Sequence, residues 1–263
     1  MTIDYSRARV EFNKNGYVLI RKFFDPNHIT SIRTDVSNAD FLSLGCDTYF
    51  ESIGDTATLK RVERFHNKFQ PLADLLRNEQ YLALLEMLLG EPPCLFKDKI
   101  NFKSSGGSGF ELHVDGHFFW QTKESGPKYR GWRHYAKSFV NAVIPLEPAT
   151  RENGALEIAE KNTTSKFLGD DWATITSKLD GDGPFIDQTT SEKIHTETIE
   201  MDVGDILIFD WTCIHGSRTN NSLTGRPILY VTYNGRSDGE NELKYFNDKS
   251  LSVASGDAKT LTR

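Results

Sequence analysis

The chain has 263 residues, 38% hydrophobic and 26% charged, a composition typical of a globular protein and not of a disordered one. Its formal net charge of −6 provides no overall attraction for nucleic acid or for an anionic membrane surface. The 3 cysteines are scattered without a zinc-binding spacing, which favours a reducing compartment over a disulfide framework.

No stretch approaches the roughly 20 apolar residues that span a bilayer, and the first residues contain no apolar run of the signal-peptide kind. We therefore expect a cytoplasmic protein that binds neither nucleic acid nor membranes. The length suits a single domain over residues 1–263, and the sequence leaves the oligomeric state open.

The N-terminal pattern predicts a helix, a strand and a second helix. Residues 4–15 form the first helix, which an Asn-Gly pair ends, and Gly16–Arg21 form the strand. Asp25 is placed to cap a helix over residues 26–38, with Pro26 at its first position.

The next segment is expected to support a sheet from outside. Residues 39–60 look irregular and are predicted to cross the surface, whereas residues 59–89 carry a leucine stripe at helical spacing. The Gly-Glu-Pro-Pro run at 90–93 ends that helical pattern. Residues 1–90 are thus predicted to be mainly a helical support.

A strand with an unusual basic face follows at residues 95–103. Lys97, Lys99, Asn101 and Lys103 share one face of it, because alternate side chains of a strand point the same way. Such a face either meets solvent, the reading that alternation alone favours, or lines an anion-binding cavity.

Short strands and turn signals continue to the end of the chain. A polar loop at 121–135 and a polar insertion at 163–195, with a helix over one barrel mouth, interrupt them, and Asn153-Gly154 predicts a hairpin turn. Further strands are expected at residues 138–146, 155–159, 196–201, 206–211 and 226–233, and a loose tail after residue 247. This pattern predicts a mainly β protein with flanking helices, whose core at about 91–247 is an antiparallel double-sheet barrel, the jelly roll or double-stranded β-helix.

The most informative motif is His113-Val114-Asp115. An imidazole and a carboxylate two residues apart can converge on one metal ion from a strand. His117 has the same parity and is a rival ligand, but we prefer Asp115 because Gly116 makes a turn there. Such a site needs a third ligand from elsewhere in the chain.

His215 is the best third ligand, because it follows the apolar strand at 206–211. Two histidines and one carboxylate on one face of a metal leave three positions open, which is the arrangement typical of non-haem Fe(II) oxygenases. Arg226 follows shortly after, and its planar guanidinium suits the carboxylate of an anionic cosubstrate.

Together, His113-x-Asp115, His215 and Arg226 resemble the motif of Fe(II)/2-oxoglutarate dioxygenases, specifically the phytanoyl-CoA dioxygenase-like family. The strand at 96–103 and the Glu-Asn-Gly-Ala-Leu run at 152–156 resemble the family as well, and the resemblance covers roughly residues 60 to 250. It implies a jelly-roll enzyme that uses Fe(II), 2-oxoglutarate and O2 to hydroxylate its substrate. A carboxylate at Asp115 implies hydroxylation and not chlorination, because halogenases of the family have a small residue there.

The resemblance also implies roles for further residues. Lys103 is expected to bind 2-oxoglutarate together with Arg226, and Ser217 and Asn101 are expected to contact this cosubstrate. The expected substrate contacts are Lys97, His117 and Trp132.

The run Phe-Lys-Asp-Lys-Ile-Asn-Phe-Lys at 96–103 looks most like the branch that hydroxylates small aminoalkylphosphonates. A free amino acid or a natural-product intermediate remains an alternative substrate. Two readings from other classes also remain: a non-catalytic, cupin-like metal- or ligand-binding module, and a zinc hydrolase with the same three ligands. A non-catalytic module has no need of two cationic anchors for a dicarboxylate, and the hydrolase lacks a clear catalytic base.

Overall fold

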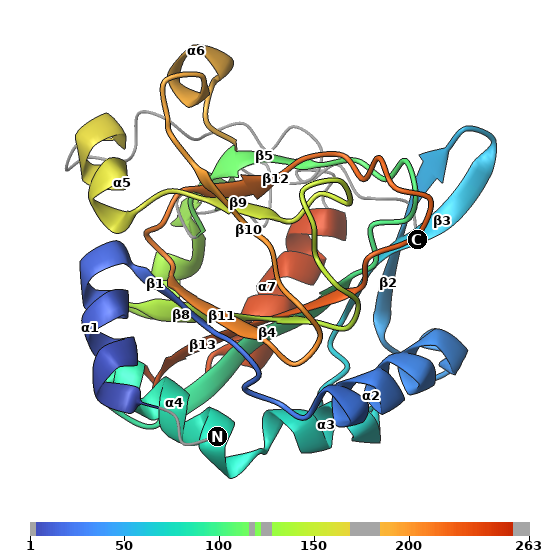
Figure 1. The fold of residues 1–263 in the computed structure, drawn as a ribbon, viewed down its shortest axis with the longest axis horizontal. Coiled ribbons are helices and arrows are strands. Elements are labelled where there is room, and N and C mark those ends of the chain that lie inside the picture. Colours follow the sequence, from blue (N-terminus) through green and yellow to red (C-terminus); the bar gives the residue numbers. More distant parts are fainter. Residues whose placement is uncertain (1–3, 116–118, 122–127, 169–184, 255–263) are drawn as a thin grey trace.

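Two antiparallel sheets face each other in the structure, a computed structural model that describes residues 4–115, 119–121, 128–168 and 185–254 (Figure 1). The larger sheet has the strand order β1-β11-β8-β13-β4-β3-β2, and the smaller has the order β10-β9-β12-β5. The larger sheet comprises β1 (Tyr17–Ile20), β2 (Asp47–Ile53), β3 (Thr56–Glu63), β4 (Pro93–Asn101), β8 (Phe139–Pro145), β11 (Ile206–Asp210) and β13 (Ile228–Gly235). The smaller comprises β5 (Phe110–His113), β9 (Leu156–Ile158), β10 (Glu197–Ile199) and β12 (His215–Ser217), and a separate ribbon pairs β6 (Phe119–Gln121) with β7 (Lys128–Arg130). This architecture confirms the predicted jelly roll.

Four helices cover the outer face of the larger sheet: α1 (Tyr5–Asn15), α2 (Pro26–Asn38), α3 (Gln70–Leu76) and α4 (Glu79–Leu89). Their buried side chains, such as Phe12 and Leu84, pack with Ile100 of β4 and Val231 of β13 in one continuous apolar cluster. The predicted caps are confirmed. The Asp25 side chain accepts a hydrogen bond from the backbone N–H of Asn27, and α1 ends at a left-handed glycine.

The inner face of the larger sheet changes character from one edge to the other. At the β1–β11 end it carries apolar side chains such as Leu207 and Phe209, which pack against Leu156 and Ile158 of the smaller sheet. At the β4–β3 end the same face carries Lys97, Lys99 and Asn101 and, directly opposite on β3, Glu63 and Arg61. This basic face is therefore not the solvent-exposed face that alternation favours. Lys97 and Asn101 are 8% and 5% exposed.

Residues 39–60 do not wander across the surface, so that prediction is wrong. They contain most of a β2–β3 hairpin, which pairs with β4 and projects from the right of the view in Figure 1. The helical pattern predicted for 59–89 likewise begins later, because β3 continues to Glu63 and two separate helices follow. Residues 1–90 thus contribute three strands to the sheet as well as helices.

The Asn153-Gly154 pair does not make a hairpin. Strand β8 before it pairs with β11 and β13, whereas β9 after it pairs with β10 and β12, so this turn carries the chain from one sheet to the other. Gly154 has a φ of 75°, the left-handed conformation that the turn requires.

The described parts of the insertion predicted at 163–195 include helices α5 (Lys161–Leu168) and α6 (Gln188–Ser191). Ile186 and Ile194 pack with Val114 and Ile214. Val114 and Ile214 are direct neighbours of the candidate ligands and point to the opposite face, so this part covers the outside of the smaller sheet and not a barrel mouth.

The loose tail predicted after residue 247 is wrong up to residue 254, because helix α7 (Glu242–Ala254) continues through it. A 3-10 turn, η3 (Arg236–Asp238), precedes this helix, whose Tyr245 and Phe246 are buried in an aromatic cluster with Phe96 and Trp132. Trp132 lies in a second short turn, η1 (Gly131–His134). None of the helices in the described part of the chain is both long and apolar enough to span a bilayer.

Candidate metal centre and cosubstrate site

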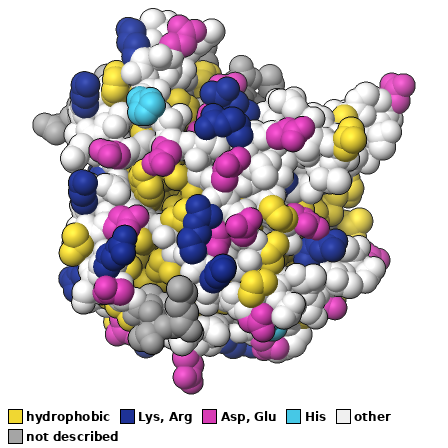
Figure 2. All heavy atoms as spheres, viewed as in Figure 1, with side chains coloured by type: hydrophobic (Ala, Val, Ile, Leu, Met, Phe, Trp, Pro, Cys, Tyr) yellow, Lys and Arg dark blue, Asp and Glu magenta, His cyan; other side chains and the backbone are white. Residues whose placement is uncertain are grey.

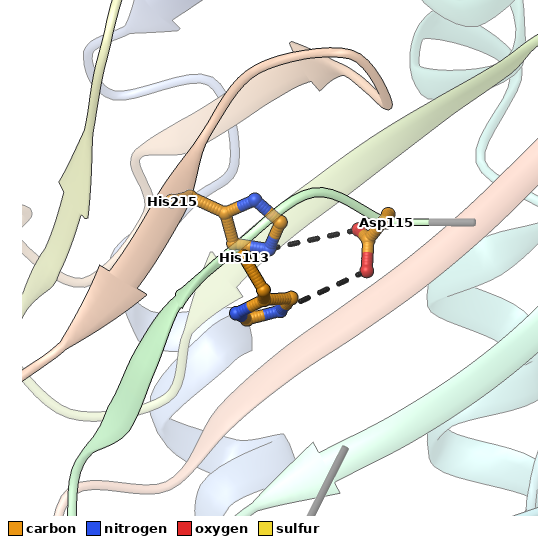
Figure 3. Close-up of side chains that lie close together, drawn as sticks. All are labelled: His113, Asp115 and His215. Carbon is orange, nitrogen blue, oxygen red and sulfur yellow. Dashed lines mark ion pairs between the residues drawn. The ribbon is translucent and has the colours of Figure 1, made fainter. Parts of the chain in front are cut away.

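Two histidines meet across adjacent strands of the smaller sheet. His113 ends β5 and His215 begins β12, and the two residues are direct partners in the antiparallel register. Cross-strand partners project from the same face of a sheet, so the imidazole rings lie with their centroids 4.3 Å apart (Figure 3).

Asp115 completes the cluster from just beyond the end of β5. Its Oδ1 lies 3.9 Å from Nε2 of His113 and its Oδ2 lies 3.6 Å from Nε2 of His215. The three ligand atoms all lie within 4.8 Å of one another, a group that could hold a metal ion. The three residues that the sequence predicts to converge therefore do lie together.

Both imidazoles present a free ring nitrogen to this cluster. Nδ1 of His113 lies 2.7 Å from the carbonyl oxygen of Glu111, and Nδ1 of His215 lies 3.0 Å from that of Cys213. A carbonyl oxygen can only accept, so each Nδ1 donates and Nε2 keeps its lone pair for a metal. Burial, and next the neighbouring His215, lowers the pKa of His113 to about 3, and burial also lowers the pKa of His215, so both rings are neutral.

Two residues of the larger sheet orient the carboxylate, and sequence reasoning missed both. The side-chain amide of Asn141 donates to Oδ2 of Asp115 at 2.9 Å, and Thr232 donates its hydroxyl to Oδ1 of Asn141 at 2.7 Å. Thr232 and Asn141 are register partners on β13 and β8. The available signal was one amide in the otherwise apolar strand Phe-Val-Asn-Ala-Val-Ile-Pro.

Arg226 is almost completely buried, at 1% exposure, just before β13. Its Nε and Nη2 donate to the carbonyl oxygens of Asn153 and Gly154 at 3.2 and 2.7 Å. Its Nη1 is buried without a hydrogen-bond partner in the described structure. An unpaired charged donor in the interior is costly, so this nitrogen fits an anionic ligand.

Lys103 is also buried, at 3% exposure, and its ammonium donates to Ser217 Oγ at 2.8 Å and to the carbonyl oxygen of Arg218 at 2.5 Å. A longer contact of 3.4 Å reaches the carbonyl oxygen of Gly154, which also accepts from Arg226. Burial, and next the proximity of Arg226, lowers the pKa of Lys103 to about 7. The structure thus brings Lys103, Ser217 and Arg226 together, as the sequence predicts.

Of the other predicted cosubstrate and substrate contacts, Asn101, Lys97 and Trp132 lie within the described structure. Asn101 has a buried Oδ1 without a partner in the described structure. Lys97 faces the same interior, and its ammonium lies 5.6 Å from the ring centroid of Trp132, which packs behind it against Phe96. His117 lies outside the described residues.

A second group, His66, Asp98 and Glu242, also meets the geometry of a metal site. The Asp98 carboxylate, however, already accepts three backbone N–H bonds at 2.7 to 2.8 Å, from Arg64, Phe65 and His66. We therefore assign Asp98 to stabilising the turn between β3 and α3.

A jelly roll that joins two histidines and one carboxylate between its sheets is typical of the non-haem metal oxygenases. The chain belongs to the phytanoyl-CoA dioxygenase (PhyH) family, whose sequence profile matches residues 12–228.

Curated relatives with phosphorus-containing substrates in their names support this assignment. The chain is 31% identical over 204 residues to a 2-aminoethylphosphonate dioxygenase from Uncultured bacterium HF130_AEPn_1, covering 76% of this chain and 69% of the relative. It is 26% identical over 252 residues to a methylphosphonate hydroxylase from Gimesia maris, covering 94% and 86% of the two chains.

Solved structures share the fold. The structure of EctD from S. alaskensis with 2-oxoglutarate and 5-hydroxyectoine has a TM-score of 0.67 at 18% identity, covering 90% of this chain and 79% of the other. The 2-oxoglutarate-dependent epimerase SnoN from nogalamycin biosynthesis has a TM-score of 0.66 at 16% identity, covering 88% and 83%.

Proposed function

We propose that this protein is an Fe(II)- and 2-oxoglutarate-dependent hydroxylase of a small phosphonate or a similar zwitterionic molecule. The observation that carries the proposal is the combination of three convergent donors with a buried arginine whose Nη1 finds no hydrogen-bond acceptor among the described residues. A metal-binding module without catalysis would gain nothing from burying a guanidinium nitrogen that no acceptor of the described residues meets.

The donor set fits ferrous iron. Nε2 of His113, Nε2 of His215 and one oxygen of Asp115 would hold the ion, and the imidazole–carboxylate mixture suits Fe(II) while leaving positions open. Asn141 fixes the carboxylate, and the Nδ1 hydrogen bonds fix both rings, so the ligands need little rearrangement on binding.

The cosubstrate would lie between the ion and Arg226. The free Nη1 would receive the distal carboxylate of 2-oxoglutarate, and Lys103, through Ser217, would border the same anion. The buried Oδ1 of Asn101 offers an acceptor on the same face. These residues orient the keto acid and exclude water from it.

When bound, iron with 2-oxoglutarate and O2 supplies the oxidising power for hydroxylation, with succinate and carbon dioxide as co-products. The chain's own residues bind and position the reactants. The neutral state of His113 and His215 keeps their lone pairs available for the metal at neutral pH.

The substrate class rests on the relatives. Curated relatives from three different organisms act, by their names, on 2-aminoethylphosphonate, methylphosphonate and hypophosphite. All three molecules are small and carry a phosphorus oxyanion, which suits the basic end of the inner face.

Anaerobic addition of Fe(II) and 2-oxoglutarate to the purified protein should give the weak visible charge-transfer band of a chelated keto acid. Admission of O2 should then release succinate faster with a phosphonate than without substrate. A protein that forms no such band, or whose activity consumes no O2, would refute the proposal.

A further inference from the structure

A cluster of buried charges lies at the β3–β4 end of the inner face. Glu63 is completely buried, and its carboxylate is within 4.0 Å of three cations. Nε of Arg61 lies at 3.3 Å, Nζ of Lys97 lies at 3.5 Å, and Lys249 of α7 makes a direct contact. Burial opposes ionisation of Glu63, but Lys249, Lys97 and Arg61 outweigh it and hold its pKa well below the usual range.

This group has an excess of positive charge. Three cations surround one carboxylate, which leaves a formal charge of +2. The side chains of Arg61, Lys97 and Lys249 keep 12%, 10% and 22% of their surface accessible, whereas that of Glu63 keeps none. A ligand from solvent would therefore meet only the positive members. By contrast, the face shown in Figure 2 mixes basic and acidic side chains.

Lys99 adds a further cation beside this group. It lies directly opposite Glu63 in the β3–β4 register and opposite Tyr230 in β13, whose ring centroid is 4.9 Å from its ammonium. Within the part of the chain that the structure describes, this ammonium has no hydrogen bond or ion pair. Burial, and next the repulsion of Lys97, lowers the pKa of Lys99 to about 8. A bound anion would offset both the burial of this ammonium and its repulsion by Lys97.

The cluster is coupled to the metal centre by neighbouring strands. Lys97 is the register partner of Thr232, and Thr232 is that of Asn141, whose amide holds Asp115. One row of side chains across three strands thus joins the cation cluster to a candidate ligand. A molecule held by the cations would lie beside the metal.

Building on the proposed function, we propose that Arg61, Lys97, Lys99 and Lys249 form the receptor for the dianionic head group of the substrate, a phosphonate. Glu63 holds three of these cations in place, and the Tyr49 hydroxyl in turn donates a hydrogen bond to Glu63 at 3.2 Å. The C-terminal helix α7 then belongs to the substrate site, because it supplies Lys249. The three cations around Glu63 leave an excess of +2, and Lys99 raises it to +3 when it is protonated. This excess suits a phosphonate dianion better than a carboxylate or a sulfonate, which carry one negative charge each.

Three probes that share a 2-aminoethyl chain separate charge from shape: 2-aminoethylphosphonate, 2-aminoethylsulfonate and β-alanine. Calorimetric titration of the Fe(II)- and 2-oxoglutarate-loaded protein at pH 8, without O2, should give tightest binding for the phosphonate. Lys99→Met should weaken phosphonate binding by about tenfold or more, and sulfonate binding by less, since a charged hydrogen bond to the dianion is lost. Equal affinity of the wild type for phosphonate and sulfonate would overturn the proposal.

Lys137→Met is the matched control, because that lysine is 89% exposed and its ammonium lies 3.9 Å from Asp238, which belongs to neither cluster. It removes the same charge and should leave all three affinities unchanged. If Lys99→Met and Lys137→Met behave alike, Lys99 is no part of a receptor.

Lys249→Met tests the purely structural alternative, in which Glu63 and its cations only fasten α7. A receptor role predicts a smaller ratio of phosphonate to sulfonate affinity in this variant. A lower melting temperature with an unchanged ratio would overturn the assignment of Lys249.

Failure of the proposed function would look different. In that case the charge-transfer band would be missing from the wild type, while calorimetry of the metal-free protein with methylphosphonate would still report on the cations. A normal band with no preference for the phosphonate would overturn the receptor alone.

Discussion

Asp115 depends on Asn141 for its orientation, because the amide occupies one of its two oxygens at 2.9 Å. Asn141→Ala should therefore weaken Fe(II) binding by about 10- to 100-fold, the usual loss when a group that orients a metal ligand is removed. Anaerobic titration of the metal, followed by the change in protein fluorescence, measures this. Asp115→Ala, as a control, should abolish metal binding at this site. An Asn141→Ala protein with wild-type affinity for Fe(II) would show that the hydrogen bond has no role in metal binding.

Two nitrogens of Arg226 donate hydrogen bonds to carbonyl oxygens, whereas Nη1 meets no acceptor in the described part of the chain. Arg226→Ala should raise the dissociation constant for 2-oxoglutarate by about tenfold or more, equivalent to about 1.4 kcal/mol or above, since a charged contact is lost. Arg226→Lys keeps the charge but not the planar fork, and should recover only part of the affinity. Titration with 2-oxoglutarate under anaerobic conditions gives both values, and unchanged affinity in the alanine variant would remove Arg226 from the cosubstrate site.

At the scale of elements, the junction between α1 and β1 is packed far more tightly than the C-terminal end of α4. Gly16 has a φ of 84°, and a Cβ there would lie 2.6 Å from both Sγ of Cys213 and Cβ of Lys161. Gly90 ends α4 with a similar φ of 79°, but a Cβ there would meet nothing within 4 Å. Both glycines have a left-handed backbone, but only at Gly16 would an added Cβ overlap with neighbouring atoms.

Gly90→Ala should therefore cost about 1 kcal/mol of unfolding free energy, from the left-handed backbone alone. Gly16→Ala should cost at least about 2 kcal/mol, because the overlap must also be relieved. Urea denaturation of the two variants side by side measures the difference. Equal losses would mean that the α1–β1 junction relaxes without cost.

The elements predictable from sequence were those fixed by local chemistry. Asp25 before Pro26 and the glycine after Asn15 specify their helix ends within a few residues, and the structure agrees. The β2–β3 hairpin had a local signal too, the two-residue turn Gly54-Asp55 between Ile53 and Thr56. Its half-exposed strands, however, lack clean alternation.

The position of helix α7, by contrast, could not be predicted from the sequence. Its position depends on Tyr245 and Phe246 meeting Phe96, and on Lys249 meeting Glu63, a residue 186 positions earlier in the chain. Nothing local predicts such a pairing. The same limit applies to Asn141, whose partner Asp115 follows β5 of the other sheet. His113 and Asp115, by contrast, were recognisable because they are two residues apart.

In the molecule as a whole, the supporting helices and the candidate site lie on opposite faces of the larger sheet. Helices and apolar side chains fill the outer face of the larger sheet. Both sheets contribute to the site on the inner face, since His113 and His215 come from the smaller and Asn141 and Lys97 from the larger. Several cations are therefore buried where an apolar core would be more stable, which makes stability depend on pH.

Lys103 and Lys99 make a contribution to that dependence whose sign follows from their lowered pKa values. Burial lowers their pKa values to about 7 and about 8, whereas an unfolded lysine titrates near roughly 10.4. Between these limits the unfolded chain binds more protons than the native protein, so the contribution of these lysines to stability rises with pH. Each can add at most about 1.4 kcal/mol per pH unit. Below about pH 7 both lysines are charged in the folded state, so the destabilisation that comes from burying these two charges is greatest there.

The Lys99→Met/Lys103→Met variant isolates this contribution from that of other groups. The free energy of unfolding of the wild type, minus that of the variant, should increase from pH 6.5 to pH 9. Urea denaturation of the metal-free proteins measures this difference. Saturating 2-oxoglutarate should reduce this slope, because an anion beside Lys103 stabilises its charged form and raises its pKa. A difference that is flat with pH would mean that both lysines stay protonated in the interior, held by charges that the described residues do not supply.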